Sequence, residues 1–258
     1  MVKRGSLNAR VAGARGAARR PSPAEAGSLA DRAYFAIRED ILQGQLRPGT
    51  PVSRRRVAGE LGMSVLPVAD ALRRLQEDGL LETRARAGTR VRVPTDADVR
   101  HLYELREALE TQSARLFAER STPAERRALE RTARDLDRQF ARLAKVGDDP
   151  ALRFAVHRQH VQLHMQIART ARSELLRQMI ERNHVLILNW VFDVDGRRTP
   201  LPARFHADLA AALISGDAAR ADAAMRAHVR HGLVEVSRHL SKLAASEWRE
   251  SKRGAKTA

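Results

Sequence analysis

The sequence predicts a mostly α-helical protein with two folded parts, a small N-terminal one that contains a β-hairpin and a larger one built from helices alone. The chain has 258 residues, enough for two domains. Ala, Leu, Arg and Glu dominate it, and only 4% of its residues are aromatic, so the cores should be aliphatic and the chain helical. The alternation of apolar and polar residues that is typical of strands stands out only within 80–93.

The composition also restricts the location and the partners of the protein. Cysteine is absent, which excludes disulfides and thiolate metal sites and fits a bacterial cytoplasmic location. No apolar run is long enough to span a bilayer, so no membrane partner is expected. The net charge of +16 is densest in the first third of the chain and favours a polyanion such as double-stranded DNA. A merely basic, solvated surface is the alternative.

The two ends of the chain lack an apolar pattern. Residues 1–28 are rich in Arg, Ala, Gly, Pro and Ser, and we expect a disordered basic arm there. An organelle transit peptide, which is also rich in Arg and poor in acidic residues, is the alternative. Residues 246–258 are expected to form a flexible tail.

The first predicted element is a helix that begins near Leu29. Its apolar residues recur at helical spacing, and Gly44 is a natural stop. These apolar positions are Ala30, Ala33, Tyr34, Ile37, Ile41 and Leu42.

Two further short helices are joined through a glycine. Ser53 can cap the first of them, Arg54–Leu61, which ends at Gly62. Ser64 can cap the second, in which Pro67 lies in the first turn, where its missing N–H does no harm. The buried stripe of this second helix is Val68, Leu72 and Leu75.

A β-hairpin follows in residues 80–93, where Val91 and Val93 alternate with arginines and Gly88 supplies the turn. Three helices plus a β-hairpin wing predict a winged helix-turn-helix over 29–94, whose third helix enters the major groove of DNA. A purely structural three-helix unit is the alternative. We expect DNA contacts from Arg54, Arg55, Arg56, Ser64, Val65, Leu66, Arg73, Arg74, Gly88 and Arg90.

Residues 95–245 carry a different pattern, long amphipathic helices separated by short breaks. We expect them to form an all-α antiparallel helical bundle. The six predicted helices are approximately 96–120, 123–145, 149–170, 172–192, 200–215 and 217–243.

These elements carry a family likeness. The run ILQGQLRPGT, the turn LGMS and the segment PVADALRRLQEDGLL resemble the head of the GntR superfamily. The segment LYELREALETQSARLFAERSTPAE resembles the opening helix of the FCD effector domain of the FadR branch. Two later segments, HRQHVQLHMQIARTARSELL and RFHADLAAALISGDAARADAAMRAHV, resemble the metal-bearing regions of that domain. Six effector helices indicate its VanR-like variant.

The resemblance implies a transcription regulator, a repressor rather than an activator, that binds a palindromic operator as a homodimer. It also implies a small carboxylate effector bound at a divalent metal. Some positions depart from the family, because Val65 and Ala69 stand where it has arginines that can read guanine, and Asp70 replaces a glutamate. Arg55 does match a DNA-contacting arginine of the family, and Gly88 matches its wing turn. DNA binding is therefore expected, but not the operator sequence of the family.

Histidines on three of the predicted helices face the interior of the bundle, where helical bundles build metal sites. His160 and His164 are four residues apart on one helix face, and His206 and His228 lie on the apolar faces of two later helices. By the resemblance these residues bind one divalent ion, with His160 in place of an aspartate. Four imidazoles favour zinc, nickel, cobalt or copper, and we expect zinc. A three-histidine site without His160, or ordinary packed histidines, are the alternatives.

Arg106 interrupts a buried apolar stripe together with Glu110 and Ser113, so its side chain must be paired or line a cavity. One interpretation is an intrahelical pair with Glu110. The other, implied by the resemblance, is an arginine that binds the carboxylate of a small organic-acid effector over the metal.

The combined pattern predicts a regulator without enzymatic activity. The first alternative is a metal-dependent hydrolase, since an ion with an open coordination position could activate water, although no general base stands out beside the histidines. The second is a sequence-neutral architectural DNA-binding protein with a vestigial sensor.

Overall fold

The computed structural model describes residues 27–84, 88–146, 149–192 and 201–254. The chain divides into two compact units, Met1–Val93 and Pro94–Ala258. The predicted disordered arm, 1–28, lies outside the described residues except for its last two. Within the described part of the chain, no helix has the length and apolarity that crossing a membrane requires.

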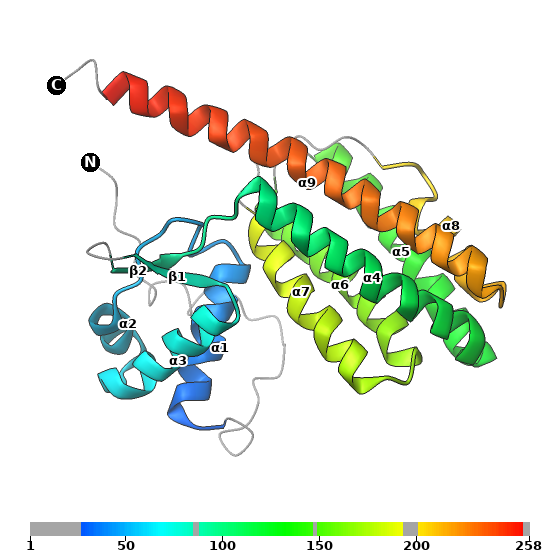
Figure 1. Ribbon diagram of the computed structural model, residues 1–258, viewed down its shortest axis with the longest axis horizontal. Helices are drawn as coiled ribbons and strands as arrows, with labels where there is room; N and C mark the ends of the chain where they lie inside the picture. The colour runs from blue at the N-terminus through cyan, green and yellow to red at the C-terminus, as the bar shows by residue number, and fades with distance from the viewer. Residues whose placement is uncertain (1–26, 85–87, 147–148, 193–200, 255–258) are drawn as a thin grey trace. The chain divides into compact units, whose positions relative to one another are not determined.

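The first unit contains three helices and one antiparallel hairpin in its described residues (Figure 1). In the hairpin, Leu81 pairs with Val91 and Arg84 with Gly88. The predicted winged helix-turn-helix is thereby confirmed. The elements are α1 (Leu29–Leu42), α2 (Arg54–Leu61), α3 (Val65–Glu77), β1 (Leu81–Arg84) and β2 (Gly88–Val91).

Local capping sets the bounds of these helices. The Ser28 hydroxyl accepts a hydrogen bond from the backbone N–H of Asp31, whose carboxylate accepts one in return from the backbone of Ser28. Ser53 caps α2, and Gly62 ends it at a φ of 64°, a left-handed conformation that favours glycine. The core of the unit contains the fully buried side chains of Ile41, Leu75, Leu80 and Val91.

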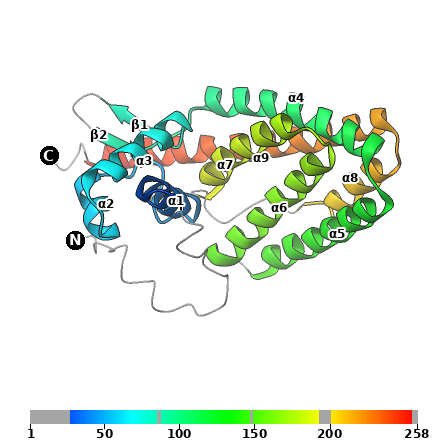
Figure 2. The same cartoon turned by 90° about the horizontal axis from the view of Figure 1, so that it is seen from below.

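The second unit is a bundle of six helices in its described residues (Figures 1 and 2). They are α4 (Asp96–Arg120), α5 (Pro123–Val146), α6 (Pro150–Thr170), α7 (Glu174–Phe192), α8 (Phe205–Ile214) and α9 (Ala218–Gly254). α4 lies alongside α9, α6 contacts α4, α5 and α7, and α8 contacts α5 and α9. One apolar cluster joins α4, α5, α6, α8 and α9, and it includes Val99, Phe117, Leu129, Leu163, Leu213 and Met225. α7 packs on α6 in a second, smaller cluster.

Two helix bounds differ from those that the sequence predicts. α8 begins at Phe205 rather than near 200. Pro202 disfavours the helical conformation in Leu201, and the backbone N–H of Phe205 donates to the carbonyl of Pro202 in a turn that precedes the helix. α9 continues to Gly254, so most of the segment 246–258 that was expected to be a flexible tail is helical. That segment contains no proline and is rich in Glu, Lys and Arg, which are good helix formers.

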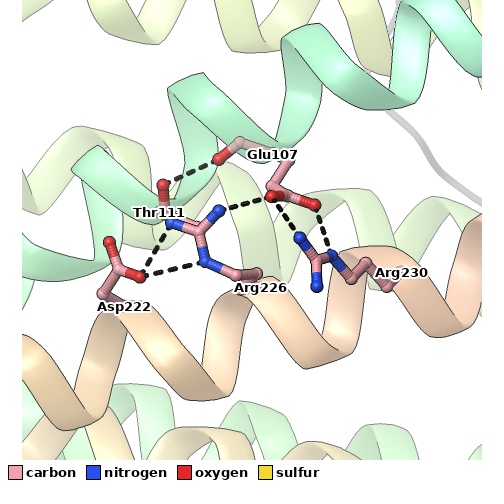
Figure 3. Close-up of polar contacts among 5 residues, drawn as sticks. All are labelled: Glu107, Thr111, Asp222, Arg226 and Arg230. Atoms are coloured by element: carbon pink, nitrogen blue, oxygen red, sulfur yellow. Dashed lines mark hydrogen bonds and ion pairs between the residues drawn. The ribbon is translucent and has the colours of Figure 1, made fainter.

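Ion pairs join α4 to α9 (Figure 3). The Glu107 carboxylate accepts hydrogen bonds from Arg226 and from Arg230, the latter at 2.8 and 3.0 Å. Arg226 is held in turn by an aspartate one turn earlier on α9. Gly232 lies against the Tyr103 ring, to which an added Cβ would come within 3.2 Å. A charge cluster and a close helix approach therefore fix the register of α4 against α9.

Candidate DNA-reading surface and histidine site

The N-terminal turn of α3 is apolar and exposed. Val65 is 45% exposed and Leu66 is 80% exposed. Ser64 is the N-cap residue, and its side chain makes no capping hydrogen bond to the described residues of the helix. The turn that the sequence assigns to the major groove thus presents two aliphatic side chains.

Carboxylates hold both arginines of α3. Arg73 donates to Asp70 at 2.9 Å and also to a glutamate one turn later. Arg74 donates to Asp31 of α1 at 2.6 Å, and its guanidinium lies 4.4 Å from the centroid of the Tyr34 ring. Arg73 therefore remains on the exposed surface, whereas Arg74 ties α3 to α1.

Basic residues of α2 and of the hairpin complete this surface. The three arginines at the start of α2 are all exposed. Arg90 donates to Glu82 across the hairpin at 2.6 Å, and Gly88, the first residue of β2, has a φ of 78°, a left-handed value that favours glycine. A groove between α2, α3 and the hairpin is lined by polar residues that include Ser53, Arg54, Arg73, Gln76, Thr83 and Thr89.

Four histidines from three helices meet inside the second unit. His160 and His164 come from α6, His206 from α8 and His228 from α9. The Nε2 atoms of His160, His164 and His228 form a triangle with sides of 3.0, 3.0 and 3.2 Å. Ring nitrogens of His160, His206 and His228 lie within 4.8 Å of one another. The structure thus brings together all four histidines that the sequence singles out.

Two carboxylates orient two of these rings. Asp137 of α5 lies 2.7 Å from Nδ1 of His206 and also accepts hydrogen bonds from two backbone N–H groups, each at 3.0 Å. Glu110 of α4 contacts Nδ1 of His164. Outer carboxylates of this kind fix the direction of imidazoles that bind metals. Sequence reasoning missed Asp137, although the residue lies beside Leu136 on the buried face of α5.

Burial favours the neutral form of three of these imidazoles. It lowers the pKa of His160 and of His228 well below the usual value, and the neighbouring imidazoles, His164 first, lower it further. Burial also lowers the pKa of His206, although Asp137 opposes this. Burial alone would raise the pKa of Asp137. The hydrogen bonds from the side chain and backbone of His206 and from the backbone of Ala207 outweigh the effect of burial, so the pKa of this carboxyl is lowered. Neutral imidazole is the form that binds a metal.

A divalent transition ion fits this set of donors. An ion about 2.0–2.1 Å from each ligand nitrogen sets neighbouring nitrogens about 2.8–3.4 Å apart, and the three sides of the Nε2 triangle fall within that range. Nε2 of His206 is buried and makes no hydrogen bond within the described part of the chain. Such a nitrogen is suited to an ion, because a buried polar atom otherwise needs a partner.

Arg106 forms the intrahelical pair that the sequence leaves as one of two interpretations. Its Nε donates to Glu110 at 2.7 Å, and the two side chains are 6% and 2% exposed. The guanidinium lies 4.8 Å from the centroid of the Tyr103 ring. Glu110 therefore connects Arg106 to His164 and to the histidine site.

Known families and solved structures match most of the chain. Residues 29–91 match the family described as bacterial regulatory proteins, gntR family, and residues 101–231 match the FCD domain. E. coli McbR/YncC has a TM-score of 0.63 at 22% identity, over 82% of this chain and 98% of that one. A putative transcriptional regulator GntR from Rhodococcus sp. RHA1 has a TM-score of 0.66 at 20% identity, over 80% of this chain and 96% of that one. These two structures show the fold.

Curated relatives match a shorter stretch. A probable D-xylose utilization operon transcriptional repressor of Paenarthrobacter nicotinovorans is 43% identical over 79 residues, 31% of this chain and 35% of that protein. The HTH-type transcriptional repressor RspR of E. coli K12 is 34% identical over 97 residues, which are 38% of this chain and 42% of that protein. The chain spans less than half the length of either relative. Because both family patterns match in order, the chain belongs to the GntR family of bacterial regulatory proteins and carries an FCD domain.

Proposed function

We propose that this protein is a DNA-binding transcription regulator that acts as a homodimer on a palindromic operator. The observation that carries the proposal is the exposed N-terminal turn of α3 beside the basic residues of α2 and the hairpin, within the part that matches the gntR family. Repression is favoured because two relatives are named repressors and because occluding a promoter needs only binding. The family consists of regulatory proteins, so the hydrolase alternative is set aside.

Sequence readout by α3 should depend on apolar contacts. Val65 and Leu66 can pack on thymine methyl groups but donate no hydrogen bonds to bases. Affinity then depends on arginines that bind phosphates, which makes it steeply dependent on salt. Arg73 has a second effect, because it shields the Asp70 carboxylate from the DNA backbone.

Arg55→Ala should relax the sequence preference, because Arg55 occupies a base-reading position of the family. Arg73→Ala should weaken binding to all sequences alike and reduce the salt slope by about one. Selection of sites from random DNA, followed by salt titration on the selected site, measures both effects. Arg134→Ala, at an exposed position of α5, is the control and should change neither. Selection without any preferred sequence would instead support the architectural alternative.

The homodimer should form through α4 and α7, two helices that contact each other. Leu105 of α4 and Leu175 and Met179 of α7 are large apolar side chains that are 48%, 68% and 39% exposed. A second copy would cover this patch. Light scattering should report twice the 28.7 kDa mass of the chain, and Leu175→Arg should halve it. The control is Val146→Arg, at an exposed position of α5, and this variant should remain dimeric. A monomeric parent protein would contradict the proposal.

In the second unit we propose a site for one divalent ion, zinc first and nickel or another transition metal next, held by the four histidines. Two signals are candidates for this site. One is a small organic acid bound over the ion, which is favoured by the position of Arg106 next to the site through Glu110. The other is the ion itself.

A further inference from the structure

We propose that α5 carries a second DNA-binding surface, a row of basic side chains that binds the phosphates of duplex DNA outside the operator. This inference rests on the proposed function, because it takes DNA as the partner of the protein. It concerns a surface of the second unit, whereas the operator is read by the first unit.

The exposed charged residues of α5 are all basic and share one face of the helix. They recur every three or four residues. At about 100° and 1.5 Å per residue, they fall within an arc of about 80° along a length of about 27 Å. The four carboxylates of α5 are only partly exposed. The basic residues of this face are Arg127, Arg131, Arg134, Arg138, Arg142 and Lys145.

Three of the four carboxylates of α5 are bound by neighbouring elements. Glu125 pairs at 2.7 Å with an arginine in the turn after α6. Asp135 accepts a hydrogen bond from a glutamine of α6 at 3.1 Å, and Asp137 is held by the histidine of α8. The carboxylates are thus largely engaged by the helices beside α5, and its outer face has one sign of charge.

Two of the six cations have a carboxylate partner on the same helix. Arg134 donates to Glu130 at 2.6 Å, and Arg138 donates to Asp135 at 2.8 Å. The other four make no ion pair with the residues that the structure describes, and they form what we call the basic stripe. Like charges four residues apart destabilise a helix, so the stability of α5 does not explain this arrangement. The members of the basic stripe are Arg127, Arg131, Arg142 and Lys145.

Other outer arginines of the bundle are neutralised. Arg177 of α7 pairs with two glutamates, and Arg226 and Arg230 of α9 share Glu107 (Figure 3). α5 lies along one edge of the bundle, with α6 and α8 beside it (Figure 2). The basic stripe is therefore a row of free cations on an accessible edge.

The length of the stripe indicates the kind of partner. A single phosphate or a small organic acid needs cations that converge on one point, whereas these cations extend over about 27 Å. Duplex DNA has a phosphate every ~3.4 Å along each strand, so the stripe can face about 8 base pairs. Such contacts carry no sequence information and add affinity by releasing counterions. The partner that fits is therefore DNA beside the operator, of any sequence.

The test measures binding of the full-length protein to two duplexes. One is the selected operator alone, and the other adds flanks of about 20 base pairs on each side, more than the ~8 that the stripe can face. The stripe variant combines Arg127→Gln, Arg131→Gln and Arg142→Gln, since glutamine is as good a helix former as arginine. On the longer duplex its salt slope should be shallower by about 2–3, because each lost phosphate contact removes about 0.9.

The matched control removes the same charge from three exposed arginines of α4 and α6 that also make no ion pair with described residues. It should keep the salt slope of the parent on the longer duplex, and on the operator alone it should match the stripe variant. Lysine at the three stripe positions should also keep that slope, because an ammonium binds phosphate as a point charge. The control substitutions are Arg115→Gln, Arg158→Gln and Arg169→Gln.

Equal losses in the stripe variant and the control would overturn the inference, because net charge alone would then explain them and the face would be merely solvated. A parent protein that gains no affinity from the flanks would overturn it as well. A parent that selects no operator contradicts the proposed function instead. In that case, a gain from longer DNA that the stripe variant alone loses would still support the stripe.

Discussion

Replacing both His164 and His206 by alanine is expected to remove the bound ion and to lower the melting temperature of the protein sharply. At free zinc a thousandfold above its Kd, loss of the ion alone lowers the free energy of unfolding by about 4 kcal/mol. The double change also takes an imidazole away from the buried carboxylates of Asp137 and Glu110. An unsatisfied buried polar group costs a further ~1–3 kcal/mol.

Two measurements separate these effects. Elemental analysis after zinc loading and dialysis should find about one ion per subunit in the parent protein and none in the double variant. Calorimetry in the presence of a chelator measures the cost that does not depend on the ion, which is that of the unpaired carboxylates together with the cavities left by the two imidazoles, because no ion is bound to either protein. His101→Ala, at an exposed position of α4, is the control and should retain the ion. Parent protein without zinc after loading would contradict the site.

The first unit could be predicted closely from sequence because its helix ends are set by local chemistry. Ser53 and Gly62 bound α2 through a side-chain cap and a left-handed residue, both of which are visible in the sequence. The strands lie within the predicted hairpin, 80–93. The extension of α9 to Gly254 was missed, because a polar run of good helix formers continues a helix without the apolar stripe that pattern analysis requires.

The histidine site could be predicted in part. His164, His206 and His228 are buried, so burial in the same core brings them together, and the partly buried His160 lies one turn before His164 on the same face of α6. The pairing of Asp137 with His206 and that of Asp31 with Arg74 join residues 69 and 43 positions apart. Such partners depend on how the helices pack, and nothing in the local pattern indicates them.

Replacing Glu110 by alanine is expected to lower the free energy of unfolding by about 3–5 kcal/mol, the cost of breaking a buried ion pair. The Arg106 side chain is 6% exposed and would lose the carboxylate that neutralises it. Removing both charges, in Arg106→Met with Glu110→Leu, should restore most of the stability, because apolar side chains of similar volume leave no unpaired charge. Urea unfolding followed by circular dichroism measures both variants.

Zinc affinity should not recover in the double variant, because Glu110 also contacts Nδ1 of His164. Loss of an outer carboxylate weakens metal binding about 10–100-fold, and we expect this in the single and the double variant alike. Competition with a chromophoric chelator measures the zinc Kd in each protein. A stability loss that persists in the double variant would show that the unpaired charge of Arg106 is not its cause. Unchanged zinc affinity would show that Glu110 does not orient His164, and the two roles of this carboxylate are thereby tested separately.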